Sequence, residues 1–145
     1  MERVTLAIKS ELRDVSLVGV SVNAICCHAG MDKQRADQVE LSLVEALTNV
    51  IRHGYHRQSQ HQISLVVTHL DGVVEFDLYD SGTPMTDSHA KRLVQGADTP
   101  DSKQFDLTAV METGRGLDII HRTMDRIAYA REGSLNHLHL AKRLQ

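Results

Sequence analysis

Aromatic residues are scarce in this sequence of 145 residues, which contains no Trp, three Tyr and two Phe. These scattered rings are too few for a platform on which nucleic-acid bases stack. An excess of basic charge is also lacking, because 16 Lys and Arg residues oppose 19 Asp and Glu residues, for a formal net charge of −3. A protein that binds nucleic acid or an anionic membrane directly is basic overall or in one patch, so the composition argues against both classes.

Only two cysteines occur, and they are adjacent, at Cys26 and Cys27. Adjacent cysteines form no disulfide framework, so they predict a reducing compartment and two small buried side chains on a helix. The chain starts with Met-Glu-Arg-Val and lacks the apolar core of a signal peptide. The apolar stretch 12–29 is interrupted by charged and polar residues, which excludes a membrane span. We therefore expect a cytoplasmic protein with one domain, residues 1–145.

The apolar pattern predicts a strand followed by two helices in the first half of the chain. Residues 4–8 alternate as in a half-buried strand, Ser10 can cap the first helix, and Gly30 can end it. Asp32 can cap a second helix, which runs to about residues 51–53.

Two hairpins are predicted in the second half. Residues 63–70 and 73–80 are rich in β-branched residues, and Asp71-Gly72 between them is a strong hairpin signal. Residues 127–131 and 135–141 form the second predicted hairpin.

The segment 81–113 shows no sustained period, and we expect a long functional loop there. Gly114-Arg115-Gly116 then opens a third helix. The complete order predicts an α+β fold. It is a two-layer sandwich in which about three helices cover one face of a mixed, mainly antiparallel sheet.

The second helix carries a narrow polar stripe on an otherwise apolar surface. At about 100° per residue, Gln38, Asn49, Arg52 and His56 fall within about 40° of Glu45. Polar groups on a buried helix must face something that satisfies them. The stripe is therefore either one side of a ligand site or the solvent-facing seam of an ordinary amphipathic helix.

Asp80 and the glycines near residue 115 are the other candidate site groups. By alternation, Asp80 at the end of the strand 73–80 points inward, where a carboxylate needs donors or a charge partner. Gly82 and Pro84 turn the chain directly afterwards, so the alternative role of Asp80 is to cap that turn. Gly114-Arg115-Gly116 lies at a helix start, where backbone amides favour an anion such as phosphate.

Together, these segments resemble the GHKL ATPase superfamily. The N box is matched by Glu45-Ala-Leu-Thr-Asn49-Val-Ile-Arg52-His53-Gly-Tyr55, the first glycine box by Asp80-Ser-Gly82-Thr-Pro84, and the second by Gly114-Arg-Gly116-Leu117. This form of the N box is similar to that of the anti-sigma-factor serine/threonine kinases of bacterial partner switching, and the resemblance covers residues 4–141. The chain departs from the family after Pro84, where Met85 and Thr86 replace a frequent aromatic residue and Asp.

The resemblance implies a role for each matching residue. Glu45 would be the general base for an attacking hydroxyl, and Asn49 would bind Mg²⁺. Asp80 would accept a hydrogen bond from the adenine amino group of ATP, and Gly82 would let the base lie close. Residues 83–113 would form the ATP lid. The predicted residues for binding the cofactor are Asn49, Arg52, His53, Asp80, Gly82, Gly114, Arg115, Gly116 and Leu117, of which Arg52 and Arg115 are included for their charge and position.

The implied activity is that of a Mg²⁺-dependent protein serine/threonine kinase. Such a protein phosphorylates a small anti-sigma-factor antagonist and sequesters a sigma factor or similar target, and its relatives suggest a possible homodimer. A non-catalytic ATP-binding module that sequesters a partner is the alternative. It needs Asn49 and Asp80 but no base, so Glu45 favours the enzyme. The detached ATP-binding domain of a two-component kinase is a third alternative, against which the N-box subtype counts.

Nine histidines also raise the question of a transition-metal site, through His53 with His56 or through His137 with His139 on one strand face. No Cys or second His pair lies at zinc-finger spacing. We therefore interpret the histidines as solvated or capping side chains, apart from His53 in the N box.

Overall fold

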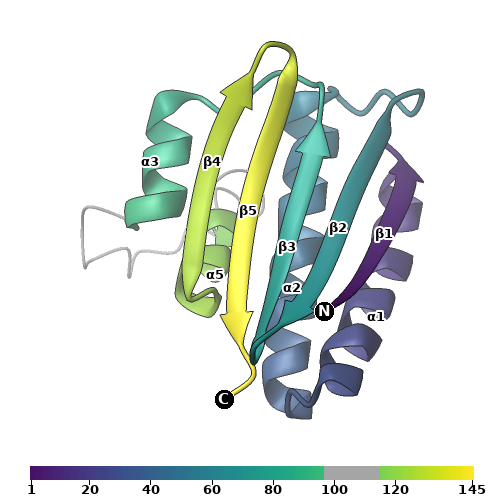
Figure 1. The fold of residues 1–145 in the computed structure, drawn as a ribbon. Coiled ribbons are helices and arrows are strands. Elements are labelled where there is room, and N and C mark those ends of the chain that lie inside the picture. Colours follow the sequence, from purple (N-terminus) through teal and green to yellow (C-terminus); the bar gives the residue numbers. More distant parts are fainter. Residues whose placement is uncertain (97–114) are drawn as a thin grey trace.

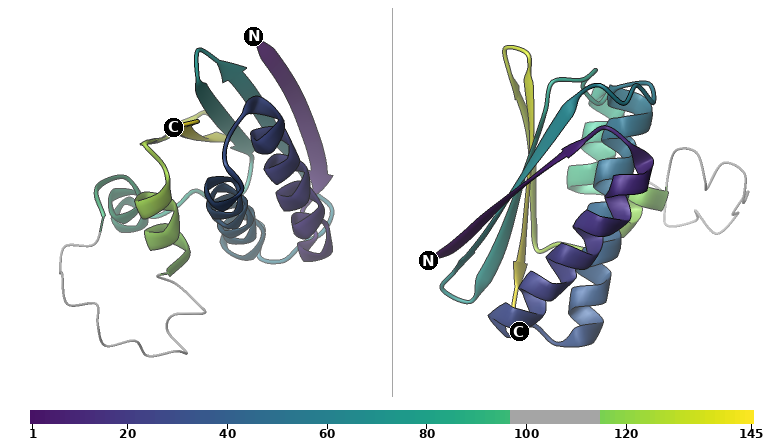
Figure 2. Two further views of the ribbon diagram at one scale, coloured as in Figure 1. Left: turned by 90° about the horizontal axis from the view of Figure 1, so that it is seen from below. Right: turned by 90° about the vertical axis from the view of Figure 1, so that its right-hand side faces the viewer.

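The computed structural model describes residues 1–96 and 115–145, in which helices cover one face of a five-stranded sheet (Figure 1). Figure 2 shows that the opposite face of the sheet carries no described helix. In chain order the elements are β1 (Glu2–Lys9), α1 (Leu12–Ala29), α2 (Lys33–Asn49), the π-helical turn η1 (Val50–Gly54), β2 (Gln62–Leu70), β3 (Val73–Asp80), α3 (Asp87–Gln95), α5 (Arg115–Thr123), β4 (Arg126–Glu132) and β5 (Leu135–Arg143).

The strands lie in the order β1-β2-β3-β5-β4, and each described neighbouring pair is antiparallel. Asp71 and Gly72 have φ angles of 53° and 76°, the left-handed values that a tight two-residue hairpin requires. Both predicted hairpins are confirmed, and so is the α+β sandwich. We expected a mixed, mainly antiparallel sheet, and every described pair of neighbouring strands is antiparallel.

The core lies between the inner face of the sheet and the helices, with β3 and α2 at its centre. Alternate residues of β3 face the helices, so Val74, Phe76 and Leu78 are buried. Leu43 and Leu47 of α2 are also fully buried. Helix α2 lies between α1 and α5, and the η1 turn that follows α2 comes close to the end of β3 (Figure 1).

The helix starts were predicted with mixed success. Asp32 caps α2 as expected, because its side chain accepts a hydrogen bond from the Arg35 amide at 2.9 Å. The expectation for Ser10 is wrong: α1 begins after Glu11 without a side-chain cap. The Ser10 hydroxyl is buried and donates to the carbonyl of Gln58, which ties the start of α1 to the loop before β2.

Helix α1 corrects one expectation about the cysteines. Cys26 is fully buried, whereas Cys27 is exposed. Neighbouring residues on a helix point about 100° apart, so only one of the two can face the core. Within residues 1–96 and 115–145, no helix is both long and apolar enough to cross a membrane.

The expectation of irregular structure throughout 81–113 is wrong over α3. Thr86 caps this helix by accepting from the His89 amide at 3.3 Å, and Leu93 packs into the core. This helix has nine residues, of which only Leu93 is buried, so few apolar positions mark it in the sequence. The rest of the predicted lid, residues 97–113, lies outside the described residues.

Candidate functional site

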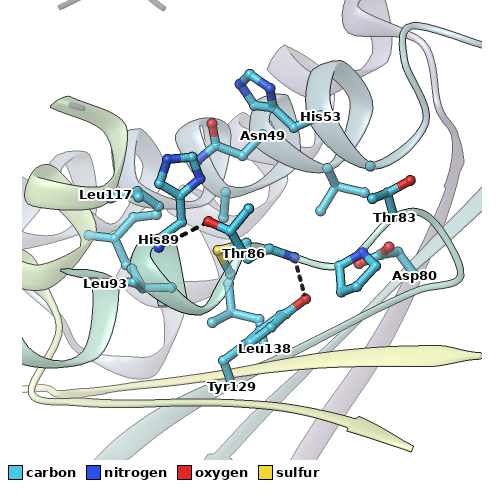
Figure 3. A pocket seen from close by; sticks show the side chains of 16 residues that line it. Asn49, His53, Asp80, Thr83, Thr86, His89, Leu93, Leu117, Tyr129 and Leu138 are labelled. Atoms are coloured by element: carbon cyan, nitrogen blue, oxygen red, sulfur yellow. Dashed lines mark hydrogen bonds between the residues drawn. The ribbon is translucent and has the colours of Figure 1, made fainter. Parts of the chain in front are cut away.

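A cavity of about 190 Å³ lies between α2, α3, α5 and the inner face of the sheet (Figure 3). It combines apolar walls with a few polar groups, the usual character of a ligand site. Four predicted site residues line it: Asn49, His53, Asp80 and Leu117. The other described lining residues are Ala46, Val50, Gly54, Thr83, Pro84, Met85, Thr86, His89, Leu93, Ile120, Tyr129 and Leu138.

Asn49 is the last α-helical residue of α2, and the chain continues directly into η1. A π-helical turn widens the helix, and such turns are frequent at functional sites. It also ends the ideal 100° spacing on which the predicted stripe depended. His53 of η1 lines the cavity beside Asn49 (Figure 3), whereas Arg52 is exposed outside the described lining. His56 lies beyond η1 with a φ of 50°.

Asp80 points inward as predicted and is only 7% exposed. Its Oδ1 accepts hydrogen bonds from the Gly82 amide and from Asn136 Nδ2, both at 2.9 Å. These donors satisfy a carboxylate that is costly to bury alone. Among the described residues, no donor contacts Oδ2, so this oxygen can accept a hydrogen bond from a ligand.

Asn136 and Arg131 support Asp80, and neither residue was among those predicted for the site. Asn136 is buried and also donates to the Gly82 carbonyl at 2.9 Å. Arg131 donates to Asn136 Oδ1 at 3.0 Å. Alternation along β5 places Asn136 on the same inward face as Leu138 and Leu140. This pattern in the sequence could have indicated that Asn136 is buried.

Gly82 lies against the backbone of Gly54. A Cβ atom at Gly82 would be 2.7 Å from the carbonyl carbon and oxygen of Gly54. The Thr83 amide donates to the same carbonyl at 2.8 Å, which joins the turn after β3 to the end of η1. Close backbone packing therefore accounts for this glycine, and Gly82 is not among the described residues that line the cavity.

Glu45 and Gly116 meet where α2 packs against α5. Glu45 is partly buried and lies outside the described lining of the cavity, as do Gly116 and Arg115. Arg115 is the exposed first residue of α5, and Leu117, two residues further on, is buried. Gly114 lies outside the described residues. Glu45 of the N box and Gly116 of the second glycine box thus lie side by side.

Tyr129 supplies an aromatic wall that the sequence did not indicate. It lines the cavity, and its hydroxyl accepts from the Met85 amide at 3.0 Å (Figure 3). Burial raises the pKa of this phenol, and the carboxylate of Asp80 raises it further, so the ring stays neutral. Met85 and Thr86, which depart from the family pattern, therefore have local roles here: a contact with Tyr129 and the cap of α3.

A two-point ion pair fixes α3 to α5 on one side of the cavity. Arg92 of α3 donates to both carboxylate oxygens of Asp118 of α5, at 2.9 and 3.2 Å. His121 Nδ1 also lies 3.0 Å from the carbonyl oxygen of Leu93. These contacts hold the start of the predicted lid against the helix that carries Gly116.

The two-layer α+β fold places a partly polar cavity at the end of α2, as in domains that bind a small-molecule ligand. Residues 8–142 match the histidine kinase-like ATPase domain, and the chain belongs to this family.

Three relatives illustrate the similarity. The serine-protein kinase RsbW of Listeria monocytogenes is 23% identical over 126 residues, which cover 87% of this chain and 78% of that protein. The SiaB–SiaC complex from Pseudomonas aeruginosa matches with a TM-score of 0.66 at 13% identity, covering 96% of this chain and 88% of the matched chain. The catalytic domain of the histidine kinase ThkA matches with a TM-score of 0.53 at 13% identity, covering 99% and 96%. At these identities, the two structural matches show a shared fold.

Proposed function

We propose that this protein is an ATP-dependent protein serine/threonine kinase of a partner-switching system. It would phosphorylate a small antagonist protein and sequester a sigma factor or similar target. The observation that carries the proposal is that Asn49 and Asp80 line one cavity, while Glu45 lies one helical turn before Asn49. The similarity to a serine-protein kinase supports a serine hydroxyl as the acceptor.

The residues around the cavity fit a magnesium–nucleotide complex. Asp80 Oδ2 can accept a hydrogen bond from an adenine amino group, and Asn49 offers an amide oxygen of the kind that Mg²⁺ prefers. When bound, Mg²⁺ would neutralise charge on the phosphate oxygens. The start of α5 and the side chains of His53, Arg52 and Arg115 would complete the phosphate site, together with Gly114.

Glu45 would act on the serine hydroxyl of the antagonist protein. Its carboxylate would accept the hydroxyl proton while the serine oxygen bonds to the γ-phosphorus. The bond between that phosphorus and the bridging oxygen breaks, which leaves ADP and a phosphoserine. The proton on Glu45 then passes to solvent, and the carboxylate is ready for another cycle.

The protein would act in the cytoplasm, could form a homodimer, and would make no direct contact with nucleic acid or membrane. Both cysteines are free, and a reducing compartment keeps them so.

The first test is a melting experiment with and without Mg²⁺ and ATP. A ligand at about 100-fold its Kd stabilises the folded protein by about 2.7 kcal/mol, so the melting temperature should rise. Asp80→Asn should retain the fold because an amide oxygen can accept the same two bonds. It should weaken adenine nucleotides much more than inorganic triphosphate, and equal losses would contradict the assigned role of Asp80.

The second test is phosphate transfer from labelled ATP to the proteins encoded beside this one. We expect a phosphoserine on one small partner. Glu45→Ala should keep the nucleotide-induced melting shift and lose transfer, whereas Gln38→Ala, at an exposed position of the same helix, should keep both. Transfer that survives in Glu45→Ala would exclude Glu45 as the base.

A non-catalytic ATP-binding module is the second candidate function. The position of Glu45 favours it, because this residue packs against Gly116 and does not line the described cavity. In that case Mg²⁺ and ATP would alter capture of a partner without producing any phosphoserine.

A further inference from the structure

Asp77, His137 and His139 form a cluster on the face of the sheet opposite the cavity. Asp77 is three residues before Asp80 on β3, so alternation directs the two carboxylates to opposite faces. His139 of β5 pairs directly with Asp77, and His137 pairs with Tyr79. The antiparallel register thus brings Asp77 beside two histidines that lie 60 and 62 residues later in the sequence.

The three side chains already converge on one point. Asp77 Oδ1 lies 2.7 Å from His137 Nε2 and 2.8 Å from His139 Nδ1. One ligand atom from each residue lies within 4.8 Å of the other two. The side chains are partly open to solvent, with exposures of 20% for Asp77, 37% for His137 and 21% for His139.

We propose that Asp77, His137 and His139 bind one divalent transition-metal ion, of which Zn²⁺ is the best fit. Two imidazole nitrogens and one carboxylate oxygen form a three-ligand zinc set that leaves one position for water. Tetrahedral geometry with bonds of about 2.0–2.1 Å separates neighbouring ligand atoms by about 3.3 Å. The two contacts of Asp77 Oδ1 need to widen by about half an ångström to reach that separation, and the two imidazole nitrogens lie within 4.8 Å of each other.

Binding requires a change of tautomer. With Asp77 ionised, His137 Nε2 and His139 Nδ1 donate to the same oxygen in the metal-free form. To bind a metal ion, each of these nitrogens must present its lone pair, so the proton of each neutral ring moves to the other nitrogen. The bonds to the metal ion then replace the two hydrogen bonds that now connect Asp77 to His137 and His139.

The neighbouring residues favour this geometry. Tyr79 stacks on His137 with ring centroids 4.5 Å apart and an interplanar angle of 16°, which restricts rotation of the imidazole. On the other side, Ala128 and Ala130 of β4 pair with His139 and His137. Their small side chains leave room for the metal ion and its water. A partly ordered ligand set loses less conformational entropy when the ion binds.

This site differs from the proposed nucleotide site in ligand chemistry as well as in position. Imidazole ligands suit zinc-type ions, whereas Mg²⁺ and Ca²⁺ prefer oxygen ligands. The sequence pattern identified His137 and His139 but no third ligand. Asp77 becomes visible only when the pairing of β3 with β5 is known.

The test is calorimetric titration of the full chain with Zn²⁺ in the absence of nucleotide. We expect one ion per chain, and His137→Gln and His139→Gln should each weaken the affinity by at least about tenfold. His69→Gln is the matched control, because His69 is another strand histidine beside a carboxylate, 3.2 Å from Glu2. It should leave the affinity unchanged, and Mg²⁺ should not compete with Zn²⁺.

A Co²⁺ titration provides a spectroscopic readout, since binding to the cluster should produce visible absorption that His139→Gln removes. Circular dichroism checks that each variant folds, and Asp77→Asn replaces any histidine variant that does not. Absence of Zn²⁺ binding overturns the proposal, as does equal weakening by His69→Gln. The melting shift caused by Mg²⁺ and ATP should persist in His139→Gln, so failure of this proposal and failure of the proposed kinase function are distinguishable.

Discussion

The carboxylate of Glu45 lies against the α-carbon of Gly116, so that a Cβ atom at position 116 would be 2.6 Å from Glu45 Oε2. The two residues belong to α2 and α5 and to two separate sequence motifs. Because only a glycine leaves the carboxylate in its present place, Gly116 controls the position of the proposed base.

Gly116→Ala is therefore expected to impair chemistry more than folding. The added methyl group displaces the end of the Glu45 side chain, and an error of about 1 Å in a reacting group can lower the rate about 100-fold. Alanine in a helix is more favourable than glycine by about 0.5–1 kcal/mol, which offsets the local crowding. Rates of phosphate transfer and urea unfolding measure the two effects. In a Glu45→Ala background, Gly116→Ala should cause no further loss of transfer, and an additional loss would contradict the mechanism.

Gly82→Ala, in contrast, is expected to impair folding more than chemistry. Its methyl group meets the Gly54 backbone at 2.7 Å, and no flexible side chain can move aside. Overpacking of this kind costs about 1–3 kcal/mol, which urea unfolding can measure. Ser81→Ala, at the exposed neighbouring position, should change the free energy of unfolding by less than about 0.5 kcal/mol. Equal stability of the two variants would show that the close approach of Gly82 to Gly54 is not required.

The sequence predicted the parts of the site that depend on local patterns. Alternation predicted that Asp80 points inward, as the structure shows, and the predicted second helix, which ran to about residues 51–53, included Asn49. The support of Asp80 could not be predicted as directly, because Asn136 reaches it across the pairing of β3 with β5. The π-helical turn also changed the directions of residues after Asn49, since the angles assumed an ideal α-helix.

Tyr55 connects the N box to the end of β3, because its hydroxyl accepts from the Ser81 amide at 2.7 Å. Tyr55→Phe removes this acceptor and leaves a partly buried amide without its partner. We expect a loss of about 1–2 kcal/mol in the free energy of unfolding, measured with urea near neutral pH. Tyr79→Phe is a suitable comparison, since Tyr79 lies on the other face of the sheet. A cost for Tyr55→Phe no larger than for Tyr79→Phe would contradict the importance of this bond.

Tyr55 should also affect the stability of the protein at alkaline pH. Burial raises the pKa of the Tyr55 phenol, and the bond from the Ser81 amide opposes part of this shift. The unfolded chain releases this proton near pH 10, before the folded protein does, so the contribution of Tyr55 is complete below about pH 10. This stabilising contribution is lost as the pH rises through the pKa of Tyr55 in the folded protein. Stability of the wild type should therefore fall more steeply above about pH 10 than that of Tyr55→Phe. Parallel curves of unfolding free energy against pH would exclude this contribution.

The two adjacent thiols should differ sharply in reactivity. Burial raises the pKa of Cys26 to about 12, with a smaller contribution from Cys27, whereas Cys27 is exposed on α1. Because the thiolate is the reactive form, a thiol reagent should modify one cysteine per native chain quickly. Cys27→Ser should abolish that fast phase, and Cys26→Ala should retain it. Reaction of Cys26 then requires α1 to leave the core, so its rate should rise with urea as local or global opening becomes more frequent. Fast modification of both thiols in the native protein would show that the core does not protect Cys26 in solution.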